Sequence, residues 1–264
     1  MCINSNLSFM MNLASPNAAA HNAYYAGRNL TDQYNDGTFS KNVSSGRFDN
    51  IFPGDYIIKT KIIDGVTYTS HIDIIAELDP YYGKWDGSKY ITTHHVGIIP
   101  LQHLGLASMN SENITTGGFK SSQMLTTTLP KYLTGYENAY GKNHLLDFAH
   151  LITNSVDTEI TSPGCSAWKG GSIGWGWIKT KITLMSEVQV YGSRVWGGGY
   201  DIGEAYKQLA VFRLNPQLIH FQNGTFWLRA VASSTNFAYS FGYGNAYGTN
   251  ASHRLFVRPL LLLY

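Results

Sequence analysis

The sequence predicts an α+β fold, with one compact domain over residues 51–264 and an extended arm over residues 1–50. Three observations lead to this class. Two β-rich runs flank Asp64-Gly65, apolar residues at helical spacing run from Leu129 to Tyr140, and the chain ends in the apolar run Phe256–Leu263. We therefore expect a sheet with at least one amphipathic helix packed on it.

The first 50 residues are rich in Asn, Ser, Ala and Gly and show little sustained periodicity. Asn17–Ala26 is the only plausible short helix there. Tyr24, Tyr25 and Leu30 are too few apolar side chains for the segment to fold alone, so we expect it to become ordered on a partner.

A β-rich region begins at Ile51. Its two strand-like runs surround Asp64-Gly65, a dipeptide that favours a tight hairpin turn. Val96–Pro100 is predicted to be a short buried strand.

A single helix is predicted in the middle of the chain. Its apolar stripe has the spacing i, i+4, i+7, i+11 and consists of Leu129, Leu133, Tyr136 and Tyr140. Thr126–Thr128 supply possible caps, and Pro130 is tolerated in the first turn. Leu184–Tyr191 fits both a helical stripe and a strand alternation, so its structure stays open.

The last forty residues are the most informative. Phe226–Val231 and Phe256–Leu263 are predicted strands, the second buried on both faces because it is almost continuously apolar. Between them, aromatic and polar residues are interleaved with small ones. Such spacing presents large, stiff contact groups at low entropic cost, which indicates a recognition surface. The alternative is a loop rich in Gly and Tyr that only packs on the domain.

Composition argues against several partner classes. A formal net charge of +2 without a run of Lys and Arg does not suit nucleic acid. Cys2 and Cys165 cannot build a disulfide framework or a Cys-based zinc site. Met1–Leu13 lacks the features of a secretory signal, and Leu260–Tyr264 is far shorter than the roughly 20 apolar residues that cross a bilayer. Neither export nor membrane insertion is predicted.

Short motifs spread over most of the chain carry a family resemblance. Those in the C-terminal part are Trp227–Arg229, Ala232–Ala238, Gly244–Ala246, Ala251-Ser252 and Val257–Pro259. Those upstream are Asn17–Leu30, Gly54–Tyr56, Thr92–His95, Met109–Met124 and Leu184–Ser193. Together they resemble the C-type-lectin-like domains of phage tail-fibre, head-fibre and tropism-determinant proteins, some of which are targets of diversity-generating retroelements.

The resemblance implies a formylglycine-generating-enzyme-like variant of the C-type lectin fold, whose surface loops bind a bacterial receptor, either a protein or a glycan. The ligand contacts then fall on Asn236, Tyr239, Phe241, Tyr243, Asn245, Tyr247, Thr249, Asn250, His253, Arg254 and Phe256. We expect the side chains beneath them to be buried, namely Trp227, Phe237, Val257 and Leu261. Phe256 is a departure, since the family usually has Gly there, and it can face either the ligand or the core.

The same resemblance implies a location and an assembly. The chain would lie on the surface of a virion, with residues 1–50 joining it to other virion proteins or to sister subunits. Because related fibre proteins tend to be trimeric, we expect a homotrimer.

Patterns for catalysis and metal binding are weak. Adjacent residues on a strand point to opposite faces, so His94 and His95 cannot both reach one ion. The family shares this His pair, which favours a structural role such as a hydrogen-bonded buried imidazole. The oxidase of the same fold depends on a cysteine pair. This chain has only Cys165 in its C-terminal half, so the pair is missing there. We expect a binding protein without catalytic residues, metal or cofactor.

Two further functions have little support in the sequence. Glycoside hydrolysis needs two facing carboxylates, for which the chain offers only the unlocated Asp73, Glu77, Asp79 and Asp86. Calcium-dependent sugar binding needs carboxylate ligands, and the nearest motif, Asn215-Pro216-Gln217, supplies none. The principal alternative to receptor binding is therefore a structural decoration protein of a capsid or tail, ahead of a polysaccharide-degrading enzyme.

Overall fold

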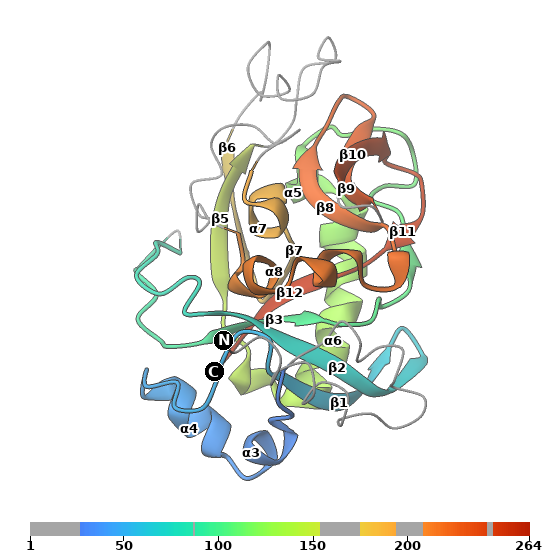
Figure 1. Cartoon of the computed structure of the whole chain (residues 1–264). Helices are drawn as coiled ribbons and strands as arrows, with labels where there is room; N and C mark the ends of the chain where they lie inside the picture. The colour runs from blue at the N-terminus through green and yellow to red at the C-terminus, as the bar shows by residue number, and fades with distance from the viewer. Residues whose placement is uncertain (1–26, 87, 154–174, 194–207, 242–244) are drawn as a thin grey trace, which may run out of the picture.

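A computed structural model of the chain describes residues 27–86, 88–153, 175–193, 208–241 and 245–264 (Figure 1). Within these ranges the structure is mixed α and β, with mostly sheet and few helices. The described residues form two five-stranded sheets and one two-stranded sheet. None of the helices described is both long enough and apolar enough to cross a bilayer.

The first sheet has the order β1-β2-β3-β12-β7, and every neighbouring pair is antiparallel. Its strands are β1 (Tyr56–Ile63), β2 (Val66–Leu78), β3 (Val96–Pro100), β12 (Pro259–Leu263) and β7 (Ile182–Leu184). Asp64 and Gly65 both have positive φ, 49° and 79°, which confirms the predicted tight hairpin between β1 and β2. The predicted strand Val96–Pro100 is confirmed, and β12 is wholly buried between β3 and β7.

Helix α6 (Leu129–Tyr140) packs against β1, as the apolar stripe predicts (Figure 1). Pro130 lies in its first turn. The predicted threonine caps are wrong, because a π-helical turn, η1 (Met124–Thr128), runs directly into the helix. Thr128 therefore has helical dihedral angles, and its side chain does not cap the helix.

The second sheet has the order β10-β9-β8-β11-β4 (Figure 1). Its strands are β4 (Leu106–Ala107), β8 (Phe226–Val231), β9 (Asn236–Phe241), β10 (Asn245–Asn250) and β11 (Leu255–Phe256). β8 confirms the predicted strand Phe226–Val231. The predicted single strand Phe256–Leu263 is instead divided, because the chain leaves this sheet after Phe256 and enters the first sheet at Pro259.

Arg258 lies at that crossing and is fully buried. Its guanidinium packs over the rings of Phe212 and Phe226, with centroid distances of 5.4 and 5.3 Å. Its Nε donates to the carbonyl of Pro100, and its Nη1 donates to that of Leu218. Arg258 therefore links the connection between the two sheets to β3 through Pro100 and to η3 (Pro216–Asn223) through Leu218.

The third sheet and the short helices complete the domain. They are α5 (Gly118–Ser121), η2 (Lys142–His144), β5 (Phe148–Thr153), β6 (Trp175–Thr180), α7 (Glu187–Tyr191), α8 (Ala210–Leu214) and η3 (Pro216–Asn223). The ambiguous stretch 184–191 contains both structures, since β7 ends at Leu184 and α7 begins at Glu187. A capping box between Ser186 and Gln189 separates them.

Residues 27–50 fold onto the first sheet. They form α3 (Thr31–Asn35) and α4 (Thr38–Ser44), drawn in blue in Figure 1. Leu30, Phe39 and Val43 are buried in the main hydrophobic cluster, and Arg28 pairs with the Asp55 carboxylate at 2.7 Å. The packed core therefore extends across the predicted boundary at residue 50. The predicted short helix Asn17–Ala26 lies outside the described residues.

Candidate ligand-binding surface

The hairpin of β9 and β10 carries most of the predicted contact residues. β10 is the edge strand of the second sheet. Tyr239 pairs with Tyr247, Phe237 with Thr249, and Phe241 with Asn245. Because side chains alternate between the faces of a strand, these paired positions share one face of the hairpin.

Three aromatic rings gather on that face and form what we call the aromatic triad, Tyr239, Phe241 and Tyr247. Their centroids are 6.3 Å apart for Tyr239 and Phe241, 6.2 Å for Tyr239 and Tyr247, and 5.6 Å for Phe241 and Tyr247. Tyr247 is 46% exposed, while the other two are half-buried. Partial burial raises the pKa of the Tyr239 hydroxyl, with a smaller contribution from Tyr247. The triad is thus one contiguous, partly exposed aromatic surface.

Buried side chains of the main hydrophobic cluster pack beside the triad. Trp227 pairs with Tyr239 on the next strand, and both Trp227 and Phe237 are fully buried. The indole Nε1 of Trp227 donates to the carbonyl of Ala107 at 2.8 Å, which fixes the ring. Val257 and Leu261 are also buried, so all four side chains predicted to lie beneath the surface have no exposure.

Polar residues follow at the end of β10. Thr249 Oγ1 and His253 Nδ1 are 2.7 Å apart, and the His253 side chain is exposed. Arg254 is also exposed, and its Nη2 donates to the carbonyl of Leu106. The oxygen Asn113 Oδ1 accepts hydrogen bonds from the backbone and side chain of Ser252, which holds this turn.

The predicted contact residues do not all share the aromatic face. Asn236 and Asn250 pair with each other and alternate with Phe237 and Thr249, so they belong to the opposite face. Tyr243 and the side chain of Asn245 lie outside the described residues. The period of two along each strand therefore divides the predicted strip into an aromatic face and a second set of positions behind it.

Phe256 also belongs to the opposite face, because it pairs in parallel with Phe226, the neighbour of Trp227. Its ring stacks on His103, with centroids 4.4 Å apart and planes inclined by 14°. The half-buried side chain packs against the second hydrophobic cluster. Of the two orientations that the sequence leaves open, the structure shows packing against the core.

His94 and His95 precede β3 and do not lie in a strand, contrary to the expectation, and their rings have different partners. His95 is buried, its Nδ1 is 2.8 Å from the Thr93 carbonyl, and its Nε2 accepts from the Tyr81 backbone. These partners fix a neutral imidazole, and burial lowers its pKa. His94 Nδ1 lies 2.6 Å from Asp79 Oδ2, and its ring stacks on Tyr82. Within the described ranges, no group of three or more His, Cys, Asp or Glu side chains could hold a metal ion.

The carboxylates weighed for glycoside hydrolysis are each engaged by their own partners. Asp73 pairs with Lys61, Asp79 with His94, and Asp86 with Lys179. Glu77 accepts from the Ala210 backbone. Each of the four carboxylates thus has an ion-pair or hydrogen-bond partner within the fold.

Comparisons with protein-family models, with curated proteins and with solved structures give no match for this chain.

Proposed function

We propose that this chain is a surface protein of a phage particle and binds a bacterial receptor through the aromatic triad. The observation that carries the proposal is the arrangement of Tyr239, Phe241 and Tyr247, which contact one another while remaining partly exposed on an edge hairpin. Rigid aromatic groups lose little entropy on binding and are enriched among the residues that dominate interface energies. The proposed role is binding without catalysis.

The packing around the triad supports this proposal. Trp227 and Phe237 share the face of the triad and are fully buried beside Tyr239, so this side of the triad is already held in place before a ligand binds. The exposed polar groups of His253 and Arg254 supply the hydrogen-bond donors expected beside an apolar centre. The resemblance of the sequence motifs to phage C-type-lectin-like domains favours the same region as the ligand-binding surface.

The test is the adsorption of the fluorescently labelled chain to a panel of intact bacterial strains. We expect saturable binding to some strains and a loss of about 2 kcal/mol in the Tyr247→Ala variant, which is about a 30-fold increase in Kd. Tyr82→Ala is the matched control, because Tyr82 is 44% exposed on a different element and Tyr247 is 46% exposed. Equal loss in both variants, or no loss in Tyr247→Ala, would contradict the proposal.

A third variant separates binding from folding. Trp227→Ala removes a fully buried side chain and should lower the free energy of unfolding by about 3–5 kcal/mol. Tyr247→Ala should leave the melting temperature almost unchanged, since much of its ring is already in water. If Tyr247→Ala unfolds the chain as Trp227→Ala does, the triad is core and the assignment loses its support.

A further inference from the structure

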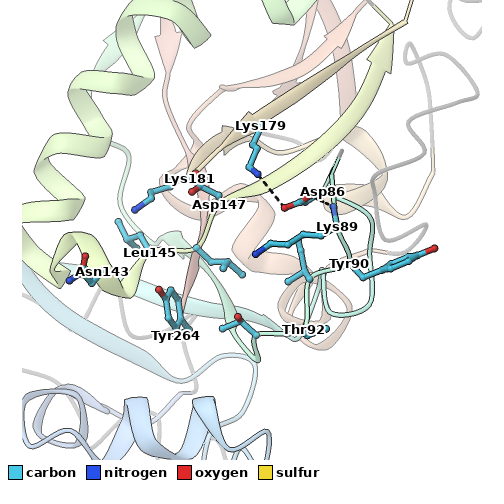
Figure 2. Close-up of a pocket in the computed structure, with 13 residues that line it drawn as sticks. Asp86, Lys89, Tyr90, Thr92, Asn143, Leu145, Asp147, Lys179, Lys181 and Tyr264 are labelled. Carbon is cyan, nitrogen blue, oxygen red and sulfur yellow. Dashed lines mark hydrogen bonds and ion pairs between the residues drawn. The ribbon is translucent and has the colours of Figure 1, made fainter.

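A polar hollow of about 240 Å³ lies apart from the aromatic triad (Figure 2). Four parts of the chain that are distant in sequence line it: Asp86 and residues 89–93 between β2 and β3, residues 143–147 before β5, Lys179 and Lys181 at the end of β6, and Tyr264. Its volume is below the roughly 300–1,000 Å³ of sites for drug-sized ligands, so it suits a single small ring. Neither β9 nor β10 contributes to it.

Asp86 organises one wall of the hollow. Its Oδ1 accepts from the backbone and side chain of Ser88 and from the backbone of Lys89. Its Oδ2 lies 3.3 Å from Lys179 Nζ. These donors, the Lys89 backbone foremost, hold the pKa of the Asp86 carboxyl well below its ordinary value. The carboxylate is therefore committed to its own turn and to Lys179.

The lysines of the hollow differ in their partners. Three lysines, Lys89, Lys179 and Lys181, line the hollow together with Asp86 and Asp147. Lys179 pairs with Asp86, and Lys181 Nζ donates to the Lys142 carbonyl and lies 3.9 Å from Glu137 Oε1. Among the described residues, the ammonium group of Lys89 has no hydrogen-bond or ion-pair partner, and Figure 2 shows it directed into the hollow on the same side as Lys179. This pair of amines is suited to an anionic group.

The rest of the lining is suited to hydroxyl groups. Thr92, Asn143 and Asp147 offer a hydroxyl, an amide and a carboxylate, which can fix the orientation of a polyhydroxylated ligand. Tyr90 is 63% exposed at the rim, and its ring points away from the lysines (Figure 2) and contacts the ring of Trp85, with centroids 5.2 Å apart.

We propose that this hollow binds a carboxylated saccharide of the uronic acid class. The carboxylate pairs with Lys89 and Lys179, and the hydroxyl groups bond to Asn143 and Asp147. This site is independent of the aromatic triad, so it stands whether or not the triad binds a receptor. The lysine and aspartate positions fix the ligand as anionic at one end and rich in hydroxyl groups at the other.

The experiment is a titration of the full-length chain with sodium glucuronate, followed by NMR or calorimetry, beside glucose and sodium acetate. We expect saturable glucuronate binding, at least tenfold weaker glucose binding, and at least tenfold weaker acetate binding. Glucose binding as tightly as glucuronate would overturn the role of the lysines. Acetate binding as tightly would reduce the hollow to a simple anion site, and no glucuronate binding would overturn the proposal.

Variants locate the binding. Lys89→Gln should weaken glucuronate binding at least tenfold while leaving the weak glucose binding unchanged. Lys120→Gln is the matched control, because it removes the same charge from an exposed position on α5 outside the hollow. Both lysines are exposed, so melting temperatures should match the wild type. Equal glucuronate affinity in Lys89→Gln and the wild type would overturn the proposal.

Discussion

At the scale of single residues, the feature with the strongest expected effect on stability is a buried ion pair beneath α6. Lys61 Nζ lies 2.6 Å from Asp73 Oδ2, and neither side chain is exposed. The hydroxyls of Tyr136 and Tyr140 donate to the same carboxylate, and His71 Nδ1 lies 3.1 Å from Lys61 Nζ. The network joins α6 to β1 and β2. A buried pair of this kind tolerates the loss of both charges better than the loss of one.

We predict that Asp73→Ala will lower the free energy of unfolding by about 3–5 kcal/mol, because it leaves the Lys61 ammonium buried without its counter-charge. The double variant Lys61→Met/Asp73→Leu should recover a large part of that loss. Urea unfolding of the wild type, both single variants and the double variant measures the coupling. Strictly additive losses would show that the two charges do not depend on each other.

Because three histidines are buried, we predict that the free energy of unfolding falls in mild acid. Burial, and then the charge of Lys61, lowers the pKa of His71 to about 4. Burial also lowers the pKa values of His95 and His150. The unfolded chain therefore takes up protons near the ordinary value of 6.5, where the folded chain does not. The stability from neutral His71 is present above pH 6.5 and is lost as the pH falls toward 4.

The measurement is the free energy of unfolding at pH 7 and at pH 5. We expect His71 alone to account for a loss of about 2 kcal/mol over this interval. His71→Gln keeps an acceptor for Lys61 but cannot titrate, so its loss should be smaller by about that amount. A His71→Gln variant with the same pH dependence as the wild type would contradict this account.

At the scale of the elements, α6 approaches β1 closely at Gly135. A Cβ added there would lie 2.6 Å from Ile63 Cγ1 and 2.8 Å from the Ile62 carbonyl oxygen. Gly135→Ala should therefore destabilise the chain by about 1–3 kcal/mol through overpacking, despite the better helix propensity of Ala. Asn138→Ala, at an exposed position of the same helix, should change stability by only a few tenths of a kcal/mol. Thermal unfolding separates the two, and a stabilised Gly135→Ala variant would be inconsistent with this packing.

Elements with a local signal could be predicted from the sequence. The hairpin at Asp64-Gly65 and the helix Leu129–Tyr140 depend on turn chemistry and periodicity within a few residues. The division of Phe256–Leu263 could not be predicted, because it depends on which sheet each half joins. The π-helical turn before α6 likewise has no counterpart in the pattern of apolar residues.

The two candidate sites differ in the same way. The aromatic triad lies within nine residues of the chain, so the local sequence is enough to predict an aromatic surface. The sequence alone does not show that Asn236 and Asn250 lie on the opposite face of the hairpin. The polar hollow draws Lys89, Asn143 and Lys179 from three distant stretches. Only the fold brings such residues together, so no local motif could have predicted it.

At the scale of the whole molecule, the C-terminal segment unites the two large sheets. β11 lies in the sheet of the aromatic hairpin, and β12 lies between β3 and β7 in the other sheet (Figure 1). Arg258, buried between them, bonds to Pro100 and Leu218 on flanking elements. Leu30 and Phe39 belong to the same hydrophobic cluster as Trp227 and Phe237, so the aromatic hairpin packs on a core that includes the N-terminal helices.

We predict that the full-length chain assembles as a homotrimer, because the phage fibre proteins whose motifs it resembles tend to form trimers. Light scattering at micromolar concentration should give three times the chain mass of 29.3 kDa. A variant that begins at residue 27, the first described residue, tests whether residues 1–26 contribute to the assembly. We expect this variant to contain fewer chains per particle than the full-length protein. A monomer mass for the full-length chain would contradict the prediction.

The proposal that the aromatic triad binds a bacterial receptor from the surface of a virion can be tested directly. The measurement is an electron cryo-microscopy map of the intact particle that carries this chain. We expect Tyr239, Phe241 and Tyr247 to face solvent, with no other virion protein covering β9 and β10. A triad buried against capsid or tail protein would contradict the claim and identify the chain as a structural decoration protein.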